Sequence, residues 1–411
     1  MAQLNITLDQ EEILLLLSEN REETFRKLLE AAMNRVLLAE SATQIGAERY
    51  ARTDSRTDSR NGVRERPLTT RIGRITLQVP RHRNQPFKTM LFDNYSRSEA
   101  ALIAAMAEMV VNGVSSRKVG IVMEALCGTS FSKSTVSEVC KDLDKDVQSF
   151  RNRPLTQEYP FVMADATYFK VRENHRLTSK AMMIAIGTSA DGKREVLGFG
   201  VFDSETNATW EEFFSSLKKR GLHGVKMLTS DAHEGIQYGL CRAFPEVPWQ
   251  RCQTHFSRNV MDHAPKQYQT AIHDEMLKMY HAETLEKARS IRDAIIAEYQ
   301  IVAEKAMQCL DEGFDSAMTV MSIPESMRRF FRTSNHLERL NKELKRRSHV
   351  IGVFPNSESL LRLIGSVLLE QNDAYIARSK VHFKTEDAAK LEQVSEQLTA
   401  IAKIQRGLLA A

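Results

Sequence analysis

The pattern of hydrophobic and polar positions changes several times along the chain. Residues 9–40 open with D-Q-E-E and then place apolar residues at helical spacing, which predicts one or two amphipathic helices. The same spacing returns in residues 100–111, 114–126 and 132–143. A short glycine-containing turn separates the last two of these helices, a layout typical of a helix-turn-helix DNA reader. Helical hairpins that only pack against their neighbours share this pattern.

Between Phe161 and Cys252 the pattern alternates between strands and helices. Apolar runs of strand length are expected to form residues 161–170, 181–187, 195–202, 225–231 and a short strand near Trp249. Amphipathic helices precede and follow the fourth strand. In this order the first and fourth strands can lie side by side, so the sequence predicts an α/β domain with a mixed five-stranded sheet flanked by helices.

Residues 265–330 are rich in Ala, Glu, Lys, Met and Gln and have helical periodicity without a strand signal, which predicts an all-helical insertion. A strongly basic helix carrying Glu338 follows. We therefore expect seven regions. They are 1–45 (helical), 46–95 (arginine-rich arm and short β segment), 96–155 (helical, DNA-binding), 156–264 (first part of the α/β domain), 265–330 (insertion), 331–355 (helix with Glu338) and 356–411 (C-terminal helices).

Composition limits the class of protein without identifying it. The chain has 42% hydrophobic and 27% charged residues, which is ordinary for a globular protein, and a net charge of +4. Its five cysteines include no C-x-x-C pair, which favours a reducing compartment. The first residues lack the pattern of a signal peptide, and no apolar run reaches the length of a membrane span. We expect a soluble, cytoplasmic protein.

Charge is concentrated in one segment. Residues 49–88 contain eleven Lys and Arg against three acids, a local net charge of +8, and the tetrapeptide R-T-D-S occurs twice. So polar a segment is expected to form a flexible arm, leading into a strand or hairpin edge that ends at Pro80. The arm could be a solvated linker. Its arginine bias favours binding to a polyanion, because guanidinium groups match phosphate geometry and binding releases counterions.

Three acids occupy unusual positions. Asp165 stands inside the apolar run F-V-M-A-D-A-T-Y-F-K, Asp231 ends the fourth strand, and Glu338 lies on the basic helix. Each acid singly could be a cap or half of a surface ion pair. Together they could hold two Mg²⁺ ions ~3.5–4 Å apart, as phosphoryl transfer requires. Lys345 lies two turns after Glu338 on the same face, where a cation suits a DNA backbone.

Several long motifs resemble bacterial insertion-sequence transposases of the mutator family. They are R-P-L-T-T-R-I-G-R-I-T-L-Q-V-P-R, D-A-T-Y-F-K-V-R at Asp165, S-D-A-H-E-G-I at Asp231, Q-R-C-Q-T-H-F-S-R-N at Cys252 and T-S-N-H-L-E-R-L-N-K-E-L-K-R-R-S at Glu338. The resemblance implies an RNase H-like DDE domain in which Asp165, Asp231 and Glu338 bind two Mg²⁺ or Mn²⁺ ions. It also implies cutting at transposon-end inverted repeats and joining of the freed 3′-OH to another strand.

The motifs also contain a rival acid, a Cys/His pair and a departure from the family pattern. Glu343, on the same helix, is the rival for the third acid, although N-H-L-E-R aligns Glu338 with the motif. Cys252 and His255 form the family's C-x-x-H signature, for which we expect a supporting role through a thiol–imidazole contact, because further zinc ligands at suitable spacing are missing. The chain departs from the family pattern at Ala232–His233, where glycine or small polar residues are common.

The expected partners are double-stranded DNA, both transposon ends and target, and a second copy of the chain in a homodimer. The protein would associate with the nucleoid when it acts. We expect phosphate contacts from the arm, the helical region and the basic helix: Arg60, Arg64, Arg66, Arg71, Arg74, Arg81, Arg83, Lys133, Lys345, Arg346 and Arg347. The alternatives are a non-catalytic DNA-binding descendant of a transposase and an RNase H-like nuclease without strand joining.

Overall fold

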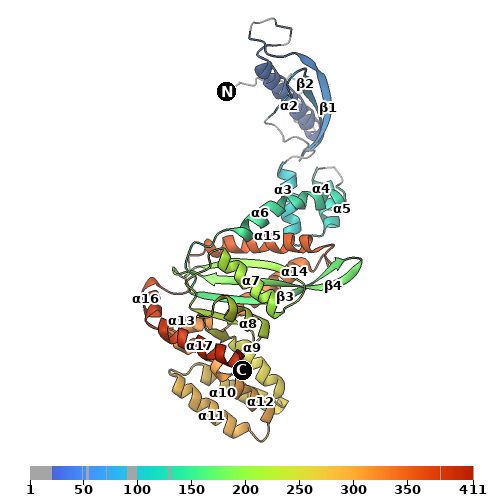
Figure 1. Cartoon of the computed structure of the whole chain (residues 1–411). Coiled ribbons are helices and arrows are strands. Elements are labelled where there is room, and N and C mark those ends of the chain that lie inside the picture. The colour runs from blue at the N-terminus through green and yellow to red at the C-terminus, as the bar shows by residue number, and fades with distance from the viewer. Residues whose placement is uncertain are drawn as a thin grey trace. The chain divides into compact units, whose positions relative to one another are not determined.

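The computed structural model describes residues 21–48, 50–51, 55–70, 72–89, 100–127, 131–379 and 381–410. The chain forms two compact units, Met1–Asp142 and Leu143–Ala411 (Figure 1). Within the described ranges, no helix combines the length and the apolar character that a membrane span needs. The part of the first expected helix before Arg21 lies outside these ranges.

The first unit begins with a helix packed on a β-hairpin. Helix α2 (Arg21–Ile45) lies on strand β2 (Gly73–His82), which pairs antiparallel with β1 (Arg60–Thr70). Leu37, Leu68, Ile75 and Leu77 form the buried centre of this contact. The alternation of buried and exposed residues along β2 is the pattern of a strand with one face on a core.

The expectation of a flexible arm is wrong for residues 60–70, which form β1. Few apolar residues suffice here because the hairpin and α2 bury them together. The second R-T-D-S repeat also has a structural role. The carboxylate of its Asp58 accepts hydrogen bonds from the backbone N–H groups of Ser59, Asn84 and Gln85, which closes the open end of the hairpin.

Three short helices complete the first unit, with the bounds α3 (Ala100–Val111), α4 (Ser116–Cys127) and α5 (Lys133–Val139), followed by the 3-10 turn η1 (Cys140–Asp142). These bounds confirm the three predicted helices. Their core includes Met106, Val119 and Val136, all fully buried. Ser132 caps α5 by accepting a hydrogen bond from the Thr135 N–H at 3.1 Å.

The second unit contains the predicted five-stranded mixed sheet. Its strands are β3 (Phe161–Glu173), β4 (Arg176–Thr188), β5 (Arg194–Phe202), β6 (Met227–Ser230) and β7 (Trp249–Arg251). The strand order is β5-β4-β3-β6-β7. The first three strands pair antiparallel, whereas β6 and β7 run parallel to β3. The expectation that the first and fourth strands are neighbours is confirmed.

Helices cover both faces of this sheet (Figure 1). One face packs on α7 (Asn207–Lys219) and α8 (Glu234–Ala243) through a core centred on Trp210. The other face packs on α6 (Leu143–Asn152) and α15 (Ser357–Ile376). Because α6 packs on α15, with Arg362 binding Asp144 through two hydrogen bonds of 2.7 Å, the unit begins at Leu143 rather than after residue 155 as the sequence suggested.

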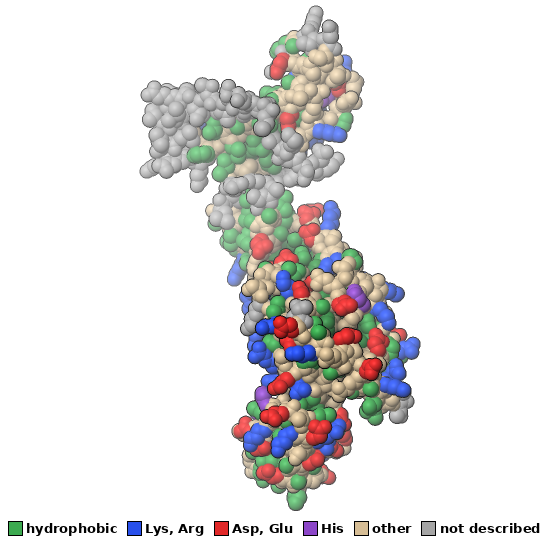
Figure 2. All heavy atoms as spheres, turned by 90° about the vertical axis from the view of Figure 1, so that its left-hand side faces the viewer, with side chains coloured by type: hydrophobic (Ala, Val, Ile, Leu, Met, Phe, Trp, Pro, Cys, Tyr) green, Lys and Arg blue, Asp and Glu red, His purple; other side chains and the backbone are tan. Residues whose placement is uncertain are grey.

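A helical block follows β7. It comprises α9 (Gln253–His263), α10 (Lys266–Tyr280), α11 (Leu285–Tyr299), α12 (Glu304–Ala317), the 3-10 turn η2 (Thr319–Ser322) and α13 (Glu325–Phe331). Its outer surface carries interspersed acidic and basic side chains (Figure 2). The chain then returns to the sheet with α14 (Asn335–Ser348), which contacts β3 and α15, and ends in α16 (Thr385–Gln393) and α17 (Ser395–Ala410).

The close contact of α7 and α8 generates a prediction. A Cβ atom at Gly239 would lie 2.7 Å from the backbone carbonyl carbon of Trp210 and 2.9 Å from the backbone nitrogen of Glu211. Neither atom can move aside, because both belong to the backbone of α7. Gly239→Ala should therefore destabilise the protein by about 1–3 kcal/mol in urea unfolding. Gly407→Ala is the matched control, because its Cβ would meet no described atom within 4 Å and should stabilise α17 by up to about 1 kcal/mol. Equal effects of the two substitutions would contradict the packing described.

Candidate active site

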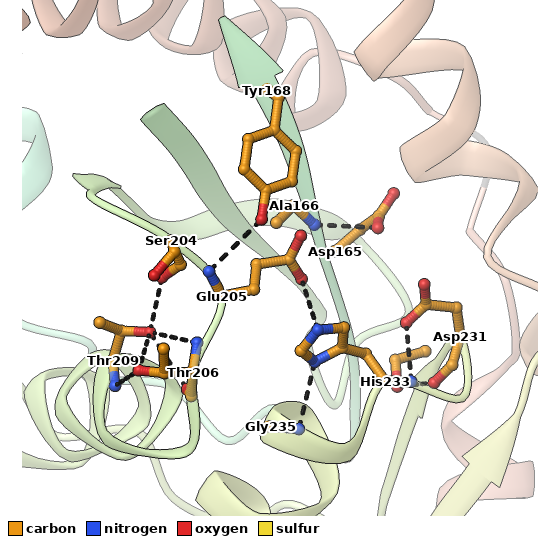
Figure 3. A network of polar contacts seen from close by, with 11 residues as sticks. Asp165, Ala166, Tyr168, Ser204, Glu205, Thr206, Thr209, Asp231, His233 and Gly235 are labelled. Atoms are coloured by element: carbon orange, nitrogen blue, oxygen red, sulfur yellow. Dashed lines mark hydrogen bonds and ion pairs between the residues drawn. The ribbon is translucent and has the colours of Figure 1, made fainter. Parts of the chain in front are cut away.

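Two carboxylates meet where β3 runs beside the end of β6. The parallel register ends with Met163 paired to Thr229. Strand β6 ends at Ser230, so Asp231 follows it directly and lies level with Asp165, two residues further along β3. Neighbouring strands are ~4.8 Å apart, which brings the two side chains together. Figure 3 shows both carboxylates at this edge. Strand order alone therefore creates a pair of acids from residues 66 positions apart in sequence.

Burial and mutual repulsion make this pair electrostatically costly. Two effects raise the pKa of Asp165 to about 7: burial, which is the larger, and the charge of Asp231. Two hydrogen bonds partly compensate. The Ala166 N–H donates to Asp165 Oδ1 at 2.9 Å, and the Asn341 amide donates to Oδ2 at 2.8 Å. The two side chains are thus held in place, and the unfavourable burial of charge on Asp165 is only partly offset.

Glu338 lies on the face of α14 that is directed toward these carboxylates. Asn341, which binds Asp165, comes one turn after Glu338 and so shares its face of the helix. Glu338 Oε1 lies 3.1 Å from His255 Nε2. Glu343 instead accepts hydrogen bonds from Arg346 and Arg347. These bonds, with that of Arg346 the stronger effect, lower the pKa of Glu343 to about 2. The geometry favours Glu338 over Glu343 as the third acid.

Cys252 links the strand end to the start of α14. Its thiol is fully buried, its N–H donates to the Ser230 carbonyl at 2.7 Å, and its Sγ accepts from the Ser334 N–H at 3.3 Å. Burial would raise the pKa of Cys252, but hydrogen bonds with His255 and Ser334 lower it overall. The Cys252 contact also raises the pKa of His255. The supporting role of Cys252 and His255 stays a prediction. These contacts show how Cys252 connects the end of β6 to the start of α14.

Sequence reasoning missed a further acid and its partner. Glu205 lies in the turn between β5 and α7 with only 13% of its side chain exposed, and its carboxylate is 3.9 Å from His233 Nε2. His233 is the residue at which the chain departs from the family pattern, and its backbone N–H donates to Asp231 Oδ1 at 3.3 Å. Figure 3 shows Glu205 between Tyr168 and His233. Its position three residues after the end of a strand was the available signal.

Burial raises the pKa of Glu205, Asp231 raises it further, and His233 opposes both effects. The Gly235 N–H donates to His233 Nδ1 at 3.1 Å, so Nδ1 is unprotonated and Nε2 carries the ring proton toward Glu205. This network adds a third carboxylate beside Asp165 and Asp231, connected to Asp231 through the His233 backbone.

The residues predicted to contact phosphates differ in how exposed their side chains are. In the first unit, Arg64, Arg74, Arg81, Arg83 and Lys133 are exposed. Arg60 is half-buried and donates to the Ala47 carbonyl at 2.9 Å, and Arg66 is 9% exposed. Arg71 lies outside the described residues. Burial makes Arg66 unsuitable for the predicted contact with a phosphate.

In the second unit, Lys345 and Arg346 are exposed, and Arg346 is paired with Glu343. Arg347 is 6% exposed, and its guanidinium binds Glu343 and Glu370, which joins α14 to α15. Burial and pairing with two acids make Arg347 unsuitable for the predicted contact with DNA. The sequence could not distinguish it from its neighbours, because its acidic partner Glu370 lies on a different helix.

The donor set fits a divalent cation in part. Among the described residues, no group of three His, Cys, Asp or Glu side chains is close enough together to hold a metal ion. Asp165 and Asp231 do supply neighbouring hard oxygen ligands, and a cation would relieve the repulsion that raises the pKa of Asp165. Glu338 would have to leave His255 to join them.

Comparison with known proteins identifies relatives along most of the chain. Residues 1–378 match the family model described as "Transposase, Mutator family". The transposase for insertion sequence element IS256 in transposon Tn4001 of Staphylococcus aureus is 39% identical over 92% of this chain and 98% of its own length. The transposase for ISRM5 of Rhizobium meliloti is 36% identical over 86% of this chain and 89% of its own. That for IS1081 of Mycobacterium tuberculosis is also 36% identical, over 88% and 87%.

The raised pKa of Asp165 generates a stability prediction. Between its ordinary pKa of 3.8 and about 7, the folded chain holds a proton that the unfolded chain has lost, so stability falls as pH rises through this window. Across the whole window, the free energy of unfolding falls by about 4 kcal/mol. Asp165→Asn should therefore raise the melting temperature at pH 8, and the gain should shrink toward pH 4.

The exposed Asp262 on α9 supplies the control, and Asp262→Asn should change the melting temperature at neither pH. Added Mg²⁺ should stabilise the wild type at pH 8 more than Asp165→Asn, because binding to the folded state alone shifts the unfolding equilibrium. If the gain from Asp165→Asn were the same at pH 4 and pH 8, the electrostatic account of this carboxylate pair would be wrong.

Proposed function

The chain belongs to the mutator family of transposases, and from this premise we propose that it is a DDE-type enzyme that cuts DNA at transposon-end inverted repeats and joins the freed 3′-OH to another strand. The observation that carries the proposal is the position of Asp165 on β3 beside Asp231, the residue that directly follows the parallel strand β6. The relatives named as insertion-sequence transposases support the same reaction class.

The fold supports this assignment. An antiparallel set of three strands extended by two parallel strands, with helices on both faces, is compatible with the RNase H-like fold that the family resemblance implies. We assign the helical block between β7 and α14 as the insertion in that domain. The block separates Asp231 from Glu338 in sequence, while the return of the chain through α14 brings Glu338 to the face directed toward β3.

The metal-binding residues of this proposal are Asp165, Asp231 and Glu338, holding two Mg²⁺ or Mn²⁺ ions. When bound, such ions neutralise charge on the phosphate and raise the reactivity of the attacking oxygen. The chain's own groups prepare the ligands. Asn341 fixes the orientation of Asp165, and His255 holds the Glu338 carboxylate near the site until it is needed. Glu205 adds negative charge beside Asp231, which strengthens the attraction for cations.

DNA binding is assigned to both units. In the first, the exposed arginines of the hairpin and Lys133 at the start of α5 would contact phosphates, with α4 and α5 as the helix-turn-helix that reads the repeat. In the second, Lys345 and Arg346 extend along α14 from the site. Two copies of the chain would pair two transposon ends as a homodimer.

The catalytic assignment predicts the result of a cleavage assay. The substrate is a labelled duplex carrying the end of the DNA element that encodes the chain, with Mg²⁺ present. Asp165→Asn and Glu338→Gln should each lower the cleavage rate at least about 100-fold, because loss of a metal ligand exceeds the 10–100-fold effect of outer partners. Glu343→Gln is the matched control on the same helix and should retain cleavage.

The outcomes separate three readings of the site. Full cleavage by Asp165→Asn would overturn the proposed function. Cleavage by Glu338→Gln together with loss in Glu343→Gln would move only the third acid. A precleaved end with a free 3′-OH, incubated with target plasmid, tests strand joining separately. Cleavage without any joined product would identify a hydrolytic nuclease instead.

The role of the hairpin arginines predicts a change in salt dependence. Replacing Arg74, Arg81 and Arg83 by alanine should weaken DNA binding and reduce the slope of log K against log salt by up to about 3, because each phosphate contact contributes ~0.9. The control replaces three exposed cations of the C-terminal helices, Lys390, Lys403 and Arg406, and should leave the slope unchanged. Equal slopes for the two triple variants would exclude the hairpin as a phosphate-binding surface.

A further inference from the structure

A cavity of about 410 Å³ lies in the second unit, between α9, α10 and the start of α14. Thr254 and Asn335 line the cavity and are joined by a hydrogen bond of 3.1 Å from the Thr254 hydroxyl. Thr254 precedes His255, and Asn335 comes one turn before Glu338. The cavity is thus lined by close sequence neighbours of His255 and Glu338, and none of the functions assigned above uses it.

One side of the cavity is apolar. Met261, Leu277 and the ring of Tyr280 contribute to it. The Tyr280 hydroxyl is satisfied by Ser257 at 3.0 Å, so the ring is fixed in position while its polar end is turned to a protein partner. Tyr280 is only 8% exposed, so Leu277, which is 40% exposed, and Met261 present most of this apolar surface. Such a surface suits a flat apolar ring.

A buried acceptor in the wall lacks a partner. Gln253 is 2% exposed and lines the cavity. Its Nε2 donates to the Ala317 carbonyl at 3.0 Å, which fixes which end of the amide is the oxygen. The Oε1 atom accepts no hydrogen bond from any described residue. A buried acceptor without a donor is unfavourable, so an amino group on a ligand would stabilise it.

The opening of the cavity is basic. Arg258 is exposed at the rim, and Arg332 lies beside it with its guanidinium 3.2 Å from His281 Nε2. A flat apolar surface, an unsatisfied acceptor and cations at the mouth are together the complement of a nucleotide: a base with an exocyclic amino group, followed by a phosphate. The volume is within the range of sites that hold small organic ligands.

We propose that this cavity receives one unpaired nucleotide of the DNA strand that passes through the active site. Its base packs on the apolar side formed by Leu277, Met261 and Tyr280 and donates to Gln253 Oε1, while the adjoining phosphate lies at Arg258 and Arg332. The inference rests on the proposed function, since it takes its ligand from the DNA being cut. It implies that DNA is locally unpaired next to the cleavage point, and that thymine, which lacks an exocyclic amino group, is bound less well.

The test measures binding and requires no cleavage. The full chain is titrated in EDTA with dye-labelled single-stranded A₂₀ and T₂₀, and with an A₂₀ that carries 2-aminopurine. Leu277→Trp fills the cavity from a residue that is 40% exposed, so folding should be retained, as its melting temperature would show. We expect at least a fivefold weaker affinity for A₂₀ and loss of the 2-aminopurine fluorescence change. Ile301→Trp, 96% exposed in the same helical block, is the control and should match the wild type.

A second variant tests the hydrogen bond to the base and leaves the cavity open. Gln253→Met removes the acceptor and should abolish the preference for A₂₀ over T₂₀ while changing T₂₀ binding little. Equal affinities of Leu277→Trp and Ile301→Trp for A₂₀ would overturn the proposal. Competition by free dAMP as strong as that by A₂₀ would also overturn it, in favour of a free nucleotide. Normal cleavage of the element-end duplex by the wild type, with unaltered binding by Leu277→Trp, would reject the cavity alone and leave the proposed function intact.

Discussion

The parallel pairing of β3 with β6 is the constraint on which the candidate site depends. It places Asp165 opposite Asp231 inside a largely buried sheet, where two like charges would separate if the backbone allowed it. The extended antiparallel pairing of β3 with β4 along its whole length keeps the backbone in place. Stability invested in the sheet therefore sustains an electrostatically unfavourable arrangement, which is a common property of functional sites.

A second set of contacts connects that sheet edge to α14. The segment from Phe331 to Ser334 runs beside the end of β6, where the Thr229 hydroxyl donates to the Phe331 carbonyl at 2.8 Å and the Gln253 N–H donates to the Arg332 carbonyl at 3.0 Å. The phenyl ring of Phe331 stacks on that of Phe161, with the ring centroids 3.7 Å apart. These contacts bring α14 back to the sheet after a helical block of about eighty residues, so the position of Glu338 does not depend on the path of that block.

The sequence predicted the parts of this structure that local patterns determine. Apolar runs located β3 to β7, and helical spacing located α3 to α5, because burial is periodic in each element. The hairpin strand β1 was missed because its apolar residues are buried only by pairing with β2 and packing against α2. Glu205 and the burial of Arg347 were missed for a related reason: each depends on a partner far away in sequence, His233 in one case and Glu370 in the other.

The packing of α15 has a consequence for biosynthesis. This helix covers one face of the sheet, and its Arg362 and Glu370 bind Asp144 and Arg347, which come earlier in the chain. Until residues 357–376 have been translated, only the short helix α6 covers that face of β3 to β5, although all five strands have been made. The order of synthesis therefore differs from the order in which the second unit can be completed. A nascent or truncated chain would expose an apolar sheet surface, which chaperones bind and which favours aggregation.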